Sequence, residues 1–254
     1  MTISWLRWGF VALVFLSACS SQPKPGEESS RFDRLFTKGQ AYLVRGNPQM
    51  ALVSLRKAQK LRPNHAVLLS QLGMAYDQVG QSGQALMAWR KAHNLNPASG
   101  AISHNLGVAM MRQQLLDEAK VAFLEALEDP KFDDRGETFY NLALIQQRRG
   151  AVREMVLGLE QVLKIDPNHI PAHQQLADYY RKMHRSDLEE RHLRNILAFQ
   201  SENVAILERL SDLYLQSGQP GKALPLLEHI QTVAPQSEAA KRAKLKQGHV
   251  LGKE

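Results

Sequence analysis

The residue types that most often carry out chemistry in proteins form no recognised catalytic constellation in this sequence. The chain has no HExxH motif and no G-x-S-x-G motif. It also has no Walker loop, because the glycines and the lysine of the segment Gly218 to Lys222 lack the spacing that this motif requires. His169 and His173 are four residues apart, but Pro171 lies between them. The pair is a weak candidate for metal binding, and the alternative is a packing or solvent-facing role. We therefore expect no catalytic residue, no metal site, no cofactor and no small-molecule substrate.

Cys19 is the single cysteine of the 254-residue chain and lies at the end of an apolar N-terminal segment. Arg7 precedes an apolar run, residues 9–16, which is too short to span a bilayer and is typical of a signal-peptide core. The sequence Leu16-Ser17-Ala18-Cys19 resembles a bacterial lipobox. The resemblance implies cleavage after residue 18, a diacylglycerol on the Cys19 sulfur and an acylated new amine. The alternative is an ordinary secretory signal with a stray cysteine.

The residue after Cys19 bears on where such a lipoprotein would be sorted. Ser20 is not an aspartate, and by resemblance to Gram-negative lipoproteins this implies the periplasmic face of the outer membrane. Residues 19–31 are rich in Ser, Pro, Gly and charge and lack apolar periodicity, which predicts a lipidated flexible tether. The formal net charge of +7 falls to about +6 without Arg7. This excess favours acidic partners or anionic surfaces, but it is no signature of nucleic-acid binding.

The elements that would position any functional residue are short amphipathic helices, seen most clearly in residues 69–97. Leu69, Leu72, Gly73 and Tyr76 share one helical face, and Ala85, Trp89 and Ala92 share another. Gly73 and Ala85 allow two helices to approach closely, and Pro97 ends the second helix because it lacks an N–H donor. A pair this small cannot bury both apolar faces alone, so we expect it to be one unit of a stack.

The same pattern recurs along the chain at a regular period of about 34 residues. The small-residue column is Gly39, Gly73, Gly107, Ala143, Ala177 and Ser211, and the bulky column of the second helix is Leu55, Trp89, Phe123, Leu159, Leu193 and Leu227. Met155 and Glu189 depart from the second-helix alanine column. These columns resemble tetratricopeptide repeats, which implies an all-α, right-handed α-solenoid of six helix-turn-helix repeats. The predicted repeats are residues 32–65, 66–99, 100–133, 136–169, 170–203 and 204–237, followed by a capping helix and tail over residues 238–254.

A stack of such hairpins presents a concave surface lined by the first helix of each repeat. Helical spacing predicts a partner-binding groove lined by Met74, Asp77, His104, Val108, Met111, Arg112, Tyr140, Leu144, Gln147, Arg148, Gln174, Asp178 and Arg181. Its middle is expected to be apolar with a basic edge, which suits a bound peptide or helix. The alternative is that neighbouring helices partly bury these side chains. The spacing between the third and fourth repeats exceeds the 34-residue period by two residues, and the extra length falls within residues 129–136. It is either a neutral loop insertion or a feature that touches a partner.

The lipobox, the tether and the six repeats together resemble the PilF/PilW/Tgl pilotins of type IV pili. Residues 126–130, ALEDP, and 137–144, ETFYNLAL, look like the middle of that family. The resemblance implies a non-enzymatic lipoprotein, anchored in the membrane through its lipid, that binds the outer-membrane secretin and promotes its localisation and multimerisation. The alternatives are an envelope adaptor that recruits peptidoglycan hydrolases or a protease, and a lipoprotein with an unrecognised catalytic groove.

Overall fold

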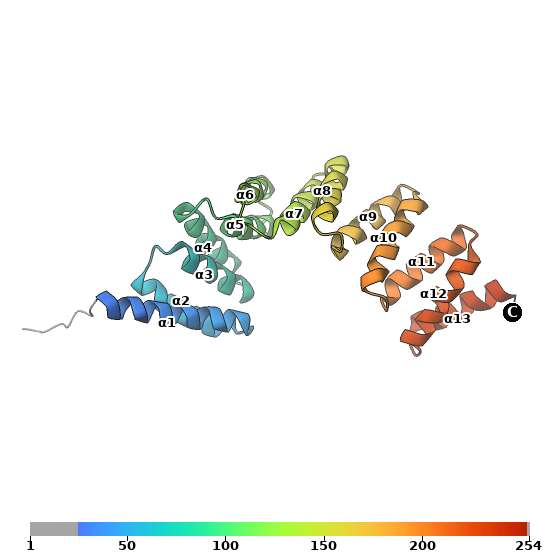
Figure 1. Ribbon diagram of the computed structural model, residues 1–254, viewed down its shortest axis with the longest axis horizontal. Coiled ribbons are helices and arrows are strands. Elements are labelled where there is room, and N and C mark those ends of the chain that lie inside the picture. The colour runs from blue at the N-terminus through green and yellow to red at the C-terminus, as the bar shows by residue number, and fades with distance from the viewer. Residues whose placement is uncertain (1–24, 253–254) are drawn as a thin grey trace, which may run out of the picture. The chain divides into compact units, whose positions relative to one another are not determined.

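The protein is described by a computed structural model over residues 25–252, and Cys19 with the predicted signal peptide lies outside the described residues. Within this range every regular element is a helix (Figure 1). The helices are α1 (Pro25–Val44), α2 (Pro48–Leu61), α3 (Ala66–Gln78), α4 (Ser82–Leu95), α5 (Gly100–Arg112), α6 (Leu116–Glu128), α7 (Arg135–Arg148), α8 (Val152–Ile165), α9 (Ile170–Lys182), α10 (Ser186–Phe199), α11 (Val204–Gln216), α12 (Pro220–Val233) and α13 (Glu238–Leu251). The chain divides into two compact units, one ending at Pro63 and one beginning at Asn64.

The first unit is the hairpin α1–α2. The expected flexible tether is wrong over residues 25–31, because α1 already begins at Pro25. Glu27 and Glu28 lie in its first turn, where negative charge favours a helix N-terminus. Ser29 Oγ then accepts a hydrogen bond of 2.8 Å from Arg62, whose guanidinium lies 4.2 Å from the ring centroid of buried Phe32. The start of α1 is thus held by the end of α2, a contact that local composition does not reveal.

The second unit consists of α3 to α13, arranged as antiparallel hairpins that each pack mainly on their neighbours in sequence. Its core is a series of small apolar clusters rather than one centre. This is the helical-repeat architecture expected from the columns, in which stability comes from each hairpin and its interface with the next. The predicted final helix is present as α13, which buries Ala239, Ala240 and Ala243.

Close approach within a hairpin depends on the small-residue column. A Cβ placed on Gly73 would come within 2.6 Å of the Trp89 ring, and one on Gly107 within 2.7 Å of Phe123. Trp89 and Phe123 are themselves buried. The aromatic ring of the second helix therefore occupies the space that a side chain on the first helix would need, as the sequence predicts.

The turns inside the six helix pairs share a left-handed residue. Gly46, Gly80, Gly150 and Gly218 have φ between 68° and 77°, and Gln114 and His184 occupy the same place with φ of 63° and 53°. A left-handed backbone costs roughly 1–2 kcal/mol for a residue with a Cβ. Four of these turns are therefore unstrained, and the turns α5–α6 and α9–α10 are strained.

Candidate functional site

All thirteen predicted groove residues lie on the first helices α3, α5, α7 and α9, where several of their polar groups join one repeat to the next. Arg112 of α5 forms an ion pair with Asp77 of α3. Gln147 Nε2 of α7 donates a hydrogen bond of 2.9 Å to Gln175 Oε1 of α9. Asp178 of α9 accepts a hydrogen bond of 2.5 Å from a residue of α11, Arg209. These side chains therefore tie neighbouring first helices together as well as lining their common face.

Met111 was predicted to line the apolar part of the groove, but its side chain does not reach that surface. Its side chain is buried in a cluster to which α4, α5, α6 and α7 contribute, so the expectation of an exposed Met111 is wrong. Its carbonyl oxygen instead accepts a hydrogen bond of 3.3 Å from Arg148 Nη1. The helical spacing placed Met111 correctly on α5 but could not show that neighbouring helices cover it.

His104 is half-buried and serves the packing between α5 and α7. Its Nδ1 lies 2.7 Å from Thr138 Oγ1, and Thr138 donates in turn to the carbonyl of Asp134, so His104 donates to Thr138. The ring also lies 5.6 Å from the ring centroids of Phe123 and of Phe132. Burial lowers the pKa of His104, and the nearby carboxylates of Asp134 and Glu137 oppose that shift. His104 is therefore a neutral spacer between repeats near pH 7.

The middle of the face keeps a half-buried apolar strip. Met74 and Val108 pack against the cluster of α4 to α7, Tyr140 packs against the cluster of α7 to α9, and Leu144 lies one turn after Tyr140 on α7. The ring centroid of Tyr140 lies 4.9 Å from that of His169, and burial raises the pKa of Tyr140. This strip offers less open apolar surface than the sequence predicts, in line with partial burial by neighbouring helices.

The accessible part of the face is mainly polar and basic. Arg112, Gln147, Arg148, Gln174 and Arg181 are exposed. Arg181 lies 3.9 Å from the carboxylate of Asp178, a distance at which an exposed ion pair contributes little to stability. The amide and guanidinium groups of these side chains supply hydrogen-bond donors that suit carbonyl and carboxylate oxygens.

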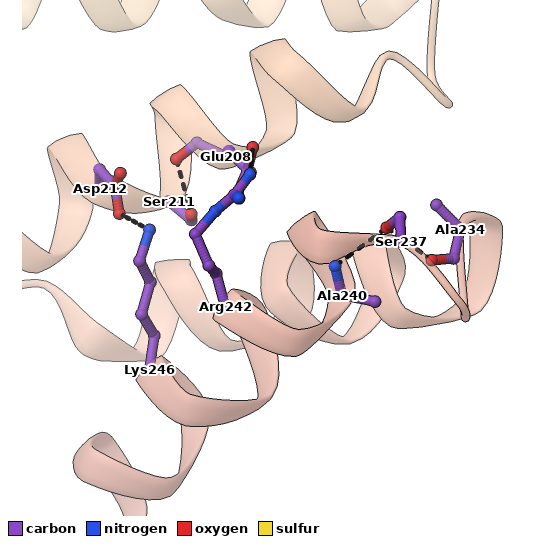
Figure 2. A network of polar contacts seen from close by, with 8 residues as sticks. All are labelled: Glu208, Ser211, Asp212, Ala234, Ser237, Ala240, Arg242 and Lys246. Carbon is purple, nitrogen blue, oxygen red and sulfur yellow. Dashed lines mark hydrogen bonds and ion pairs between the residues drawn. The ribbon is translucent and has the colours of Figure 1, made fainter.

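Polar ties continue between α11 and α13 beyond the predicted lining residues (Figure 2). Both carboxylate oxygens of Glu208 accept hydrogen bonds of 2.9 Å from Arg242, and Asp212 accepts one of 2.5 Å from Lys246. Ser237 Oγ caps α13 by accepting from Ala240 N at 3.1 Å. In both ion pairs the basic residue follows the acidic residue by 34 positions, which is one repeat period. A search of the sequence for acid–base pairs at that spacing could have predicted them.

The histidines that raised the question of a metal site have packing roles. His169 Nδ1 accepts a hydrogen bond from Ala172 N at 3.1 Å and thereby caps α9. Buried His173 faces buried His192 of α10, with 2.8 Å between their Nδ1 atoms. Within residues 25–252 no three His, Cys, Asp or Glu side chains gather in a way that could hold a metal ion.

The insertion at residues 129–136 is an ordered part of this scaffold. Asp129 Oδ2 accepts a hydrogen bond of 2.8 Å from Gly100 N at the start of α5. Phe132 is buried and approaches Gly100 so closely that a Cβ there would lie 2.6 Å from the Phe132 Cβ. Arg135 donates to the carbonyl of Leu127 at 2.8 Å. The extra length thus brings a buried ring under α5 and holds the loop in place.

Comparison with known proteins agrees with this helical-repeat fold. Residues 32–65 match the family described as Tetratricopeptide repeat, which is the range predicted for the first repeat. No curated protein sequence matches the chain. The fold is of the tetratricopeptide type, a class that generally serves as a scaffold for protein–protein interaction.

Solved structures extend the likeness to most of the chain. The structure described as functional characterization of Pseudomonas aeruginosa PilF superposes with a TM-score of 0.71 at 21% identity, covering 86% of this chain and 99% of that one. PilW, described as a widely conserved type IV pilus biogenesis factor, gives 0.67 at 18% identity, covering 83% and 97%. YrrB, described as a tetratricopeptide protein with an unusual peptide-binding site, gives 0.55 at 18% identity, covering 75% and 97%. At these identities the likeness establishes the fold.

No helix among residues 25–252 combines the length and the apolar character needed to cross a bilayer.

Proposed function

We propose that this protein is a non-enzymatic pilotin that binds the outer-membrane secretin of the type IV pilus and promotes its localisation and multimerisation. In this proposal a lipid on Cys19 anchors the chain to the periplasmic face of the outer membrane. The face of the first helices then holds a segment of the secretin subunit. The observation that carries the proposal is the near-complete coverage of the PilF and PilW structures by this one chain.

The chemistry of the first-helix face supports a polypeptide as the bound partner. Exposed Arg112, Arg148 and Arg181 supply fork-shaped donors, which suit carboxylates and backbone carbonyls. The half-buried strip containing Val108 and Tyr140 lies beside them and offers apolar contact. A bound peptide would therefore combine acidic or carbonyl groups with one or two apolar anchors.

Deletion of the gene in the native bacterium tests the proposal. We expect secretin multimers that resist detergent to be lost or strongly reduced on gels, and to return when the wild-type gene is supplied. A Cys19→Ser chain should fail to restore them at the outer membrane. Unchanged multimers in the deletion strain would disprove the pilotin role, and altered septation or cell-wall turnover in their place would favour the envelope adaptor.

A pair of variants tests the surface. Arg148→Ser with Arg181→Ser removes two exposed cations from the first-helix face. Arg153→Ser with Lys164→Ser removes two exposed cations from α8, a second helix, and serves as the matched control. We expect the first pair to weaken binding of the purified secretin tenfold or more, and the control pair to change it by less than threefold. Equal effects would place the binding surface elsewhere.

A further inference from the structure

The positive charge of this protein is concentrated in its first compact unit. Residues 25–63 contain eight Lys and Arg against the three acids Glu27, Glu28 and Asp33, a net charge of +5. Of the 32 basic and 25 acidic residues of the chain, 22 of each lie in residues 64–254, so that part is neutral. The two remaining cations are Arg7 and Lys24. The overall charge of +7 is therefore not a general property of the scaffold.

Part of this charge lies along one side of α1. Arg31, Arg34 and Lys38 follow each other at spacings of three and four residues, which places them on one helical face. All three are exposed, whereas Phe32 and Leu43 are buried on another face. Glu27, one turn before Arg31, is the acidic residue on the basic side. We refer to Arg31, Arg34 and Lys38 as the α1 basic face.

Lys38 marks how unusual this face is among the repeats. It occupies the column that holds Leu72, Leu106, Leu142, Leu176 and Leu210 in the later repeats. Leu72, Leu106, Leu176 and Leu210 are buried, whereas Lys38 is exposed. In the described part of the chain, no salt bridge joins Arg31, Arg34 or Lys38 to an acid. Lys38 Nζ lies 5.8 Å from the ring centroid of Tyr42 on the same helix, and all three cations remain exposed to solvent.

We infer that the α1 basic face docks on an anionic lipid surface. The inference uses the proposed anchor, because only five residues lie between Cys19 and Pro25, and the six steps from one to the other span at most about 20 Å. The start of α1 is thereby kept within reach of the lipid headgroups. Salt screens electrostatic attraction over a Debye length of about 8–10 Å at physiological ionic strength, so the cations nearest the lipid contribute most, and these are the residues of the α1 basic face. Each Lys or Arg near an anionic membrane strengthens partitioning by about fivefold.

Vesicle binding tests this docking without the lipid anchor and without the secretin. The probe is the unacylated chain from Ser20 onward, which keeps every residue that the structure describes. It is mixed with vesicles of phosphatidylcholine alone, or of phosphatidylcholine and anionic phosphatidylglycerol in equal parts. We expect sedimentation with the anionic vesicles only, weakened by raising the salt. The triple variant Arg31→Gln/Arg34→Gln/Lys38→Gln should lower the partition coefficient at least tenfold.

The matched control removes the same charge from the second unit. Arg153→Gln/Lys164→Gln/Lys182→Gln neutralises three exposed cations that form no salt bridge in the described chain, and we expect less than a threefold change. Circular dichroism should show the same helix content in all three proteins. Absence of binding to the anionic vesicles, or an equal loss in both triple variants, would overturn the inference. Because no secretin is present, these outcomes are independent of the pilotin proposal.

Discussion

Glu189 Oε1 accepts a hydrogen bond of 2.7 Å from Arg209 Nε, and this pair explains why repeat five departs from the alanine column. The Glu189 side chain is 5% exposed and that of Arg209 is 18% exposed, so the charges are largely removed from water. Asp178 completes the cluster by accepting from Arg209 Nη1 at 2.5 Å. Where four of the other repeats pack an alanine, repeat five ties α9, α10 and α11 together through one guanidinium.

This cluster predicts an asymmetry between its two ends. Arg209→Met leaves Glu189 buried without its counter-charge, and we expect a loss of about 3 kcal/mol in the free energy of unfolding. Glu189→Ala introduces the residue found at the equivalent position of four other repeats, namely Ala51, Ala85, Ala119 and Ala223. It leaves Arg209 paired with Asp178. We expect that variant to lose about 1 kcal/mol, and the double variant to be more stable than Arg209→Met. Urea unfolding of the four proteins decides it, and additive losses would contradict a coupled pair.

The strained turns predict two stabilising substitutions. Gln114→Gly and His184→Gly place glycine where Gly46, Gly80, Gly150 and Gly218 already stand with positive φ. Each should raise the free energy of unfolding by about 1 kcal/mol, because the left-handed conformation then carries no Cβ penalty. The matched control is Gly80→Ala, which should lower it by a similar amount. Thermal melts provide the measurement, and a destabilised Gln114→Gly would contradict the strain.

The pair His173–His192 predicts that stability falls in mild acid. His173 Nε2 donates to the carbonyl of Pro167 at 2.9 Å, so its Nδ1 must accept from His192 Nδ1. Burial lowers the pKa of His192 to about 4, helped by the charge of His173 and of Arg191, and burial also lowers the pKa of His173. The unfolded histidines take up protons near pH 6.5. The folded state is therefore favoured fully above that pH and loses stability as the pH falls toward 4.

A variant that copies the next repeat isolates this effect. His173 and His192 correspond, one repeat later, to Leu207 and Leu226. His173→Leu/His192→Leu should flatten the dependence of the unfolding midpoint on pH between 6.5 and 4.5. His229→Gln, at a half-buried histidine outside this pair, should leave the slope unchanged. If the double leucine variant keeps the full slope, the acid sensitivity has another source.

The contact between Gly73 and Trp89 predicts that a side chain at position 73 destabilises the fold and that a smaller residue at position 89 compensates. Gly73→Ala places a Cβ 2.6 Å from the indole, and we expect a loss of about 2 kcal/mol. Gly83→Ala adds a Cβ with no heavy atom within 4 Å and should be close to neutral. Trp89→Leu should recover much of the loss in the Gly73→Ala background, because Ala143 and Ala177 are paired with Leu159 and Leu193 in later repeats. Thermal unfolding provides the comparison.

The periodic columns predicted the fold because they describe contacts inside a hairpin. Gly73 against Trp89 and Gly107 against Phe123 are such contacts, and their residues recur at the repeat period. Features that depend on a neighbouring element were harder to predict. Met111 is covered by other helices of its cluster, and the first turn of α1 is held by Arg62, which lies far along the chain from Ser29.

The sequence predicted which helix face carries the candidate site, but it did not predict which of its side chains pair with one another. Helical spacing placed Asp77 and Arg112 on adjacent first helices, and the structure shows them paired with each other. The spacing of His173 and His192 in the sequence matches no helical or repeat period, so only the folded chain brings them together. The buried Glu189 was visible as a departure from its column, but its partner was not.

The polar ties between neighbouring hairpins join residues that are close in sequence, from 20 positions apart in Glu189 with Arg209 to 37 in Arg148 with Met111. Closing loops of this size carries a small entropic penalty, and topologies dominated by near-sequence contacts reach the native state quickly. In a chain with such short-range contacts, an N-terminal hairpin can fold before the C-terminal part of the chain is present. If the polypeptide is threaded across a membrane in an unfolded form, each hairpin of the second unit has its partners at hand as soon as the next one emerges.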